Sequence, residues 1–543
     1  MLRRRSLAAC NQSRMSTADK ITRLRERMSD PQWRRYAYTL FAGKLTALAI
    51  LFGVITLVAL FQGSGVHADP ADYPGAKVDM GTAVNAINTT WTLVAAFLVF
   101  AMQVGFTMLE AGFCRSRETV NVLMECVVDT CLCGLLFWAF GYAFMFSSGN
   151  GFIGLHWFML NHAPLTYPGT GVALLAHWIF QFAFADTCST ITSGAMIGRT
   201  GFVGDLLYSV GVSGFIYPIV GHWAWGPDGF LAMMGSKGYF LPTLGNSFHD
   251  FAGSTVVHTI GGTIALAGSI VLGPRIGRTF KRDGGGPMLP HDLVIACTGG
   301  LILWFGWYGF NPGSSLSAID FSGIGRISAN TTLAACAAGL SAMFVAFPLT
   351  KKWDLGFTVN GFLAGLVAIT CPCYWVTPTG AVILGAVAGA LVVAGVEFLE
   401  YIRIDDPIGA VPVHMFCGIW GTWSLGLFAS GSYGATGPTG ADTSSPLKGL
   451  FYGGGFKLLE AQIIGNAIIT LSTFALAMGL MYAVHLTGTL RVSREGELEG
   501  LDIHEHGIPA YPEYALVPGA APAGMLTNSA GGNPSPVHKS TDA

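Results

Sequence analysis

Charged residues are scarce in this chain: Asp, Glu, Lys and Arg together make up only 11% of its 543 residues, and the formal net charge is −2. Typical soluble domains have about 25% charged residues. The low charge argues against a soluble domain, and the near-zero balance gives no sign of nucleic acid or of an acidic surface partner. Hydrophobic residues, in contrast, account for 52% of the chain.

Patterns for metal binding, disulfides and catalysis are also lacking. The eleven cysteines lie mostly in apolar segments, and Cys131 and Cys133 are separated by one residue, whereas zinc ligands are commonly two to four residues apart. Buried free thiols usually behave as small hydrophobic residues. His504 and His506 are a weak metal candidate at best, and the sequence shows no nucleophile–base pair. We therefore expect no cofactor, no metal and no enzymatic activity.

Long apolar runs are the dominant feature of the chain. A membrane-spanning helix needs about 20 mainly apolar residues. Twelve segments qualify, near 40–62, 88–112, 121–147, 172–197, 202–224, 251–273, 291–310, 328–349, 357–375, 379–399, 409–430 and 456–486. The first is set apart by a Pro-, Gly- and Asp-containing stretch, 69–87, which we expect to be an exposed loop. The sequence predicts an all-α polytopic membrane protein with a membrane domain over 88–486.

The loop charges predict the orientation. Ten Lys and Arg residues fall in the loops on one side of the predicted membrane domain, against five on the other. Positive loops usually stay in the cytoplasm, so eleven spans would begin outside and end with a cytoplasmic segment, 487–508. Residues 509–543 are rich in Pro, Ala and Gly and are expected to be disordered. The basic leader and apolar segment, 1–68, is either a signal peptide cut after Ala68 or a retained anchor.

One motif occurs twice. DFAGSTVVHTIGG begins at Asp250 and DPIGAVPVHMFCG begins at Asp406, and a gapless alignment pairs these aspartates and also His258 with His414. The copies lie in the fifth and tenth of the eleven spans, so they enter the membrane from opposite sides. This pattern predicts an inverted 5+5 repeat, in which transport sites lie between the halves.

The paired histidines have two interpretations. His258 and His414 follow their aspartates by eight residues, which is about 12 Å of helix, so each lies well inside the bilayer. They are either two buried, hydrogen-bonded histidines or parts of a pathway, and ionisable residues within a membrane mostly line pathways. An aspartate at a helix start is a good N-cap. The carboxylates could therefore be structural while the imidazoles are functional.

Aromatic motifs accompany the repeat. HWAWG starts at His222, WIFQFAFAD at Trp178 and WFGWYGFNPGSS at Trp304. They could form an aromatic belt at the membrane interface, or a cage beside a hydroxyl that attracts a small cation. With FLVFAMQVGFTMLEAGF, NGFLAGLVAIT and LEGLDIHEHG, they make the chain resemble the ammonium transporter (Amt/Mep/Rh) family, Amt-type, from about residue 85 to 508.

The resemblance implies a fold, a function and a set of site residues. It implies eleven helices, a homotrimer with one pore per subunit in the plasma or inner membrane, and ammonium, ammonia or methylammonium as substrate. The C-terminal segment would couple subunits and, in many members, meets a PII-type regulator. The site residues that it implies are Trp225, Phe184 and Ser314 with Asp250 beneath them for ammonium recruitment, Phe184 and Phe310 as the pore gate, and His258 and His414 in the pore.

The expected function is an ammonium transporter or channel. Ammonium would be deprotonated at the outer site, and ammonia would cross an apolar pore with or without the proton. The alternative is an ammonium sensor that hardly conducts. The chain departs from the family at Glu125, where Lys is common, at Asp186, where a small residue is usual, at Gly198, where Glu is common, and at Met415, where Gly often follows the histidine. Rate, electrogenicity and regulation stay open.

Overall fold

The computed structural model describes residues 79–434 and 446–511. Over these ranges the chain is mostly helical, and its sheet is one short antiparallel pair, β1 (Gly149–Asn150) and β2 (Ile153–Gly154). The predicted leader and apolar segment, 1–68, and nearly all of the predicted tail, 509–543, lie outside the described residues. The fold described below is that of the predicted membrane domain and its C-terminal segment.

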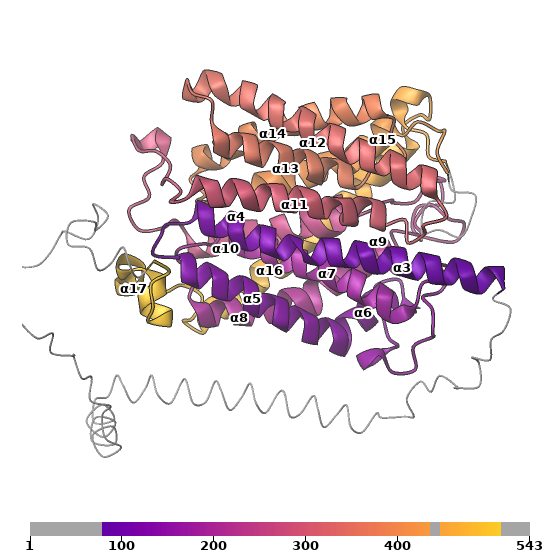
Figure 1. Ribbon diagram of the computed structural model, residues 1–543, viewed down its shortest axis with the longest axis horizontal. Coiled ribbons are helices and arrows are strands. Elements are labelled where there is room, and N and C mark those ends of the chain that lie inside the picture. Colours follow the sequence, from indigo (N-terminus) through magenta and orange to yellow (C-terminus); the bar gives the residue numbers. More distant parts are fainter. Residues whose placement is uncertain (1–78, 435–445, 512–543) are drawn as a thin grey trace, which may run out of the picture. The chain divides into compact units, whose positions relative to one another are not determined.

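Long helices run side by side through this domain (Figure 1). The first half contains α3 (Met80–Phe100), α4 (Met102–Phe113), α5 (Thr119–Leu136), η2 (Phe137–Gly141), α6 (Tyr142–Phe146), η3 (Phe158–Leu160), α7 (Leu174–Gly194), α8 (Phe202–Gly211), η4 (Val212–Ile216), α9 (Tyr217–Trp225), η5 (Ser254–Thr259) and α10 (Ile260–Leu272). The second half contains η6 (Lys281–Asp283), α11 (Leu293–Gly313), α12 (Phe321–Thr350), α13 (Leu355–Thr370), α14 (Pro378–Ile402), η7 (Val411–Phe416), α15 (Cys417–Phe428), η8 (Leu450–Tyr452) and α16 (Lys457–Leu486). The C-terminal segment contains α17 (Arg494–Glu499) and η9 (Asp502–His506).

Eight helical stretches within the described residues are long and apolar enough to cross a membrane. They agree with the prediction of a polytopic membrane protein. The other predicted spans of the membrane domain, near 172–197, 357–375 and 409–430, are helical as well, as α7, α13, and η7 with α15. Helix α13 is apolar but only 16 residues long, whereas α7 carries Asp186 and several hydroxyls and η7 carries His414.

The first helix of the domain starts earlier than the sequence indicates. We expected an exposed loop up to residue 87, but α3 begins at Met80. Asp79 accepts a hydrogen bond of 2.7 Å from the backbone N–H of Thr82 and caps the helix. The last part of the expected loop is therefore helical, because an N-cap aspartate can start a helix before the apolar run begins.

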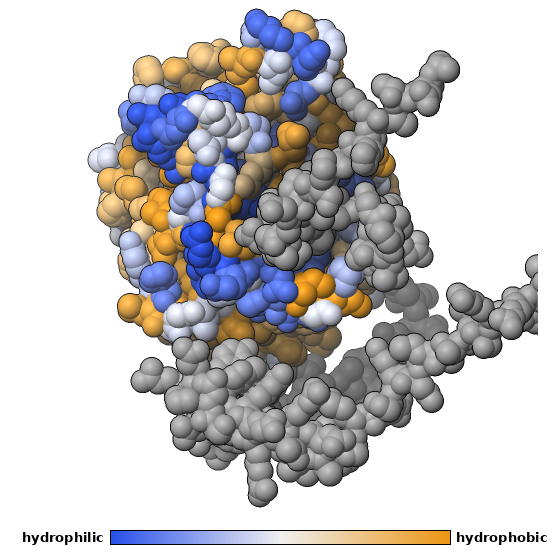
Figure 2. Space-filling model, turned by 90° about the vertical axis from the view of Figure 1, so that its left-hand side faces the viewer, coloured by the Kyte–Doolittle hydropathy of each residue, from blue (hydrophilic) through white to orange (hydrophobic). Residues whose placement is uncertain are grey.

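Small residues allow the helices to approach closely. A Cβ atom on Gly299 of α11 would lie 2.4 Å from the backbone nitrogen of Leu109 and 2.5 Å from the carbonyl oxygen of Gly105, both on α4. Backbones at this separation accept no side chain between them, which is the packing typical of membrane helices. At the end of the domain that carries α17, polar residues gather on the surface beside hydrophobic ones (Figure 2).

Candidate functional site

Aromatic side chains surround a cavity of about 570 Å³. It lies where the first half of α7 meets the end of α9, the turn before η5 and the end of α11. Trp225, Phe184, Ser314 and Asp250 all line it, so the structure brings the four residues predicted for ammonium recruitment to one cavity. They come from segments far apart in the sequence.

The polar groups of this cavity are fixed by backbone contacts. The indole N–H of Trp225 donates a 2.7 Å hydrogen bond to the carbonyl oxygen of Asp250, and its ring meets Phe184 edge-on, with centroids 6.1 Å apart. The Ser314 hydroxyl donates to the carbonyl oxygen of Phe310 at 2.8 Å. Since that proton is committed, the Ser314 oxygen can offer its lone pairs to an N–H donor.

Both aspartates of the repeated motif act as caps. Asp250 accepts three backbone hydrogen bonds of 2.8–3.0 Å at the start of η5. Asp406 accepts three of 2.8–3.1 Å at the start of η7. In each copy the turn passes through a glycine with positive φ, 114° at Gly253 and 79° at Gly409. The carboxylates are occupied by the backbone, which agrees with a structural role for them.

The two histidines meet between the repeats. His258 lies in η5 and His414 in η7, both π-helical turns, which are rare and frequently occur at functional sites. Their Nδ1 atoms are 3.2 Å apart, so one nitrogen must donate a proton and the other accept it. Among the described residues, Nε2 of His258 has no hydrogen-bond partner.

Two stacked phenylalanines lie between the cavity and the histidines. The rings of Phe184 and Phe310 are 4.0 Å apart at 24°, and both are buried. Phe184 faces the cavity, whereas the ring of Phe310 lies 5.4 Å from that of His258. The order along this line is therefore cavity, phenylalanine pair, histidine pair.

The two copies of the motif run in opposite directions. Arg275, just after α10, pairs with Asp405, just before η7, at 2.9 Å. At the other end, Ser430 follows α15 and donates to the carbonyl oxygen of Trp375 at 2.9 Å. The ring of Trp375 also packs against His249, which precedes η5. The end of each copy thus lies near the start of the other, as an inverted repeat requires.

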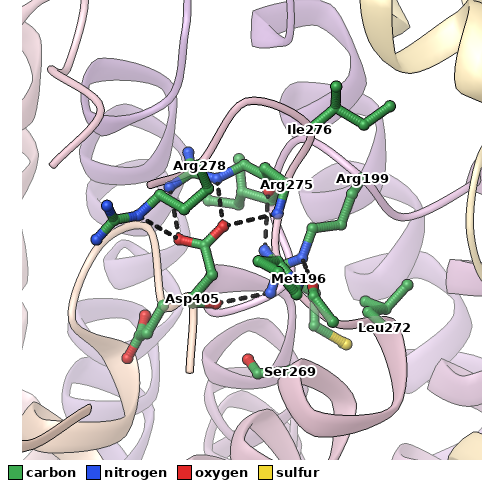
Figure 3. A network of polar contacts seen from close by, with 12 residues as sticks. Met196, Arg199, Ser269, Leu272, Arg275, Ile276, Arg278 and Asp405 are labelled. Atoms are coloured by element: carbon green, nitrogen blue, oxygen red, sulfur yellow. Dashed lines mark hydrogen bonds and ion pairs between the residues drawn. The ribbon is translucent and has the colours of Figure 1, made fainter. Parts of the chain in front are cut away.

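A buried ion-pair network joins the loops at the α10 end (Figure 3). Asp405 accepts from Arg275 at 2.9 Å and lies 3.4 Å from Arg278, while Arg199 donates to the backbone carbonyls of Asp405 and Gly273. Burial alone would raise the pKa of Asp405, but the Arg275 guanidinium outweighs it and holds that pKa well below its usual range. Burial lowers the pKa of Arg199 to about 10, which leaves it charged at neutral pH.

The C-terminal segment packs on its own subunit. Arg491 donates to the carbonyl oxygen of Leu272 and pairs with Glu497 at 2.9 Å. Asp502 accepts from the backbone N–H of Asn121 at 3.0 Å. The segment thus touches both the end of α10 and the start of α5. Within the described ranges, no group of three or more His, Cys, Asp or Glu is arranged to hold a metal ion.

The departures from the family motif have different structural settings. Gly198 has φ of 81°, and a Cβ there would lie 2.8 Å from the Glu118 carboxyl group. The carboxylate of Glu118 therefore occupies the space beside Gly198. Glu125 and Asp186 are buried. The sequence indicates that both add acid near Asp129, but it did not indicate that Glu110 and Asp205 are buried as well.

A histidine at the cavity was also missed. His177 lines the cavity, stacks on Tyr167 with centroids 3.8 Å apart and forms a 2.8 Å hydrogen bond with Tyr142. The only signal for it was a polar residue next to Trp178 in an otherwise apolar segment.

Comparisons with known proteins agree with this arrangement. The model of the Ammonium Transporter Family matches residues 90–511. The chain belongs to the ammonium transporter family. Its relatives include "Ammonium transporter Amt2" of Archaeoglobus fulgidus, 40% identical over 87% of this chain and 97% of that protein. "Ammonium transporter 1 member 1" of Arabidopsis thaliana is 40% identical over 74% of this chain and 81% of that protein.

Solved structures of the family share the fold. A protein titled "Sensor Amt Protein" matches with a TM-score of 0.69 and 35% identity, covering 79% of this chain and all of that one. Mep2 of Candida albicans matches with a TM-score of 0.67 and 25% identity, over 80% of this chain and 91% of that one. The two curated relatives are named as ammonium transporters, and one of the two solved structures is titled as a sensor.

Proposed function

We propose that this family member recruits ammonium in the aromatic cavity, removes a proton and passes ammonia between Phe184 and Phe310 to the pair His258 and His414. The observation that carries the proposal is the order of these groups along one line, from a cavity that suits a cation to a dry region that suits a neutral molecule. Trp225 and Phe184 offer ring faces for a cation–π contact, and Ser314 offers a hydrogen-bond acceptor.

Electrostatics supports deprotonation before passage. Moving an intact cation into a buried apolar region has a high free-energy cost, whereas the cost for a neutral molecule is far lower. The Phe184–Phe310 stack and the buried histidines behind it form such a region. The shared proton between the two Nδ1 atoms fixes the orientation of the imidazoles, and it leaves Nε2 of His258 to meet the passing molecule.

Assembly and orientation belong to the same proposal. Eleven spans with an inverted 5+5 repeat would form each subunit of a homotrimer in the plasma or inner membrane. The mature N-terminus would lie outside, and the C-terminal segment would lie in the cytoplasm, where positive loop residues are concentrated. A PII-type regulator is the partner that the C-terminal segment would suit.

A sensor is the second candidate, because one structural relative is titled as a sensor. A sensor would bind ammonium in the same cavity but carry little current. Measuring ammonium-driven uptake together with current in proteoliposomes separates the two: a sustained flux, with or without current, indicates a transporter, and tight binding without flux indicates a sensor.

Replacing the cavity tryptophan tests the recruitment site. In Trp225→Leu we expect the apparent affinity for ammonium and methylammonium to fall about tenfold, because a cation–π partner worth about 1–2 kcal/mol is lost. Trp223→Leu is the matched control, since Trp223 lies two residues away and does not line the cavity. An unchanged affinity in Trp225→Leu would contradict the assignment.

A further inference from the structure

Five carboxylic acids are buried inside the helical domain, away from the proposed pathway. Each is at most 2% exposed, and they come from four helices: Glu110 on α4, Glu125 and Asp129 on α5, Asp186 on α7 and Asp205 on α8. Ionisable groups inside a membrane are costly and tend to be functional. The pathway through the two phenylalanines and the two histidines uses none of these acids.

Helical spacing brings these acids to a common interior. Asn121, Glu125 and Asp129 follow one another at intervals of four residues and so share one face of α5. Asp205 and Ser209 do the same on α8. Helix α5 packs against both α7 and α8, and Ser209 lies beside Asp129. The row of polar residues on α5 and the row on α8 thus face each other along the bundle.

Several oxygens in this interior form no hydrogen bond of ordinary geometry within the described residues, although polar side chains such as Ser209 lie beside them. Both carboxyl oxygens of Asp129 and of Asp186, the second oxygen of Asp205 and the Ser209 hydroxyl lack a hydrogen-bond partner, although all are buried. The Tyr208 hydroxyl donates to the first oxygen of Asp205. Buried polar groups without partners are uncommon and point to an unseen ligand.

The charge on these acids is not balanced by neighbouring side chains. Within residues 79–434 and 446–511, none of the five acids forms an ion pair. The other titratable side chains on α4, α5, α7 and α8 are the thiols of Cys126, Cys131, Cys133 and Cys188, the phenol of Tyr208 and the imidazole of His177, which lines the aromatic cavity. Unpaired carboxylates in a low-dielectric interior take up protons rather than stay ionised.

A hydrogen-bonded chain leads from this interior to the C-terminal segment. Asn121 donates to Glu125 at 2.8 Å, and its side-chain oxygen lies 2.9 Å from Nε2 of His506. Partial burial lowers the pKa of His506, so its ring is mainly neutral at neutral pH and can pass a proton from one nitrogen to the other. Asp502, which bonds the backbone of Asn121, and the carboxyl groups of Glu118 and Glu505 are the other titratable groups beside this chain.

We propose that Glu110, Glu125, Asp129, Asp186 and Asp205 form a proton-binding site that exchanges protons with the cytoplasmic face at its Glu125 end, where His506 takes up and releases the proton and Asn121 orients both side chains without carrying it. Each binding event joins one proton from cytoplasmic water to one carboxylate, giving a neutral carboxylic acid. The site is separate from the ammonium pathway, and the inference does not rest on the proposed function.

Infrared difference spectroscopy of the full chain in lipid vesicles tests this site. We expect the C=O band of protonated carboxyl groups to be present at neutral pH and to lose a component in both Glu125→Gln and Asp186→Asn, which keep the side-chain shape. Glu495→Gln is the control, because Glu495 is exposed on α17. On transfer to heavy water this band shifts as the carboxyl protons are replaced by deuterium. In His506→Ala the shift should be at least tenfold slower, because the group that exchanges protons with cytoplasmic water is lost.

Three results would overturn the proposal. The first is the absence of a protonated-carboxyl band at neutral pH, and the second is a band unchanged in both isosteric variants. The third is a rise in melting temperature specific to sodium or potassium over a large organic cation, with loss of that rise in Asp186→Asn, because the ligand would then be a monovalent cation. If Asp186→Asn fails to fold, Glu125→Gln and the exchange rate in His506→Ala still decide.

Discussion

At the scale of single residues, His258 and His414 form one unit because their Nδ1 atoms share a proton at 3.2 Å. Removing either imidazole leaves the other without its partner. We expect ammonium current to fall or lose selectivity in His258→Ala and in His414→Ala, with the double variant little worse than either. Such non-additivity is typical of directly interacting groups.

Two measurements distinguish this pair from independent buried histidines. Ammonium currents and melting temperatures are recorded for the two single variants and the double variant. Independent histidines predict that destabilisation adds and that transport survives in the protein that folds. Wild-type currents with additive loss of stability would rule out a joint role in the pathway.

At the scale of elements, Asp405 ties the loop before η7 to the loop after α10. Its pKa in the folded protein lies below the ordinary value of 3.8, because Arg275 overcomes the effect of burial. The unfolded chain therefore binds more protons in acid, so the stabilisation is complete well above pH 3.8 and is lost as the pH falls through that value towards the folded pKa.

We expect Asp405→Asn to destabilise the protein by about 3–5 kcal/mol at neutral pH, because the buried Arg275 loses its partner. The variant should also lose part of the drop in melting temperature that the wild type shows on acidification. Melting curves from neutral pH down to pH 3 check both, with the exposed Glu495→Gln as control. If the drop in melting temperature on acidification were identical in Asp405→Asn and wild type, other carboxyl groups would be responsible for it.

At the scale of the whole molecule, we expect three copies per particle. A mass measurement of the purified protein in mild detergent, together with crosslinking in membranes, should return a trimer. The C-terminal segment packs on its own α5 through Asp502, while parts of its surface, such as Ile503, remain exposed for a neighbouring subunit. Monomers under all mild conditions, without intersubunit crosslinks, would contradict the assembly.

The sequence by itself determined the helical class, the approximate positions of the spans within the described residues and the repeated motif. These are local properties: an apolar run long enough for a bilayer is visible in any window of the chain, and the spacing of Asp250 and His258 recurs at Asp406 and His414. The starts of α3 and α12 were exceptions, because caps at Asp79 and Asp320 extended these helices beyond the apolar runs.

Only the tertiary structure decided which side chains meet. The 3.2 Å contact of His258 with His414, and the place of Phe184 between cavity and histidines, join residues more than a hundred positions apart. The group of buried acids was indicated only in part, since the sequence places Glu125 and Asp186 near Asp129. Only the packing of α5 against α7 and α8 brings Asp205 into the same interior. Contacts between helices depend on how the helices rotate and approach, which no single span specifies.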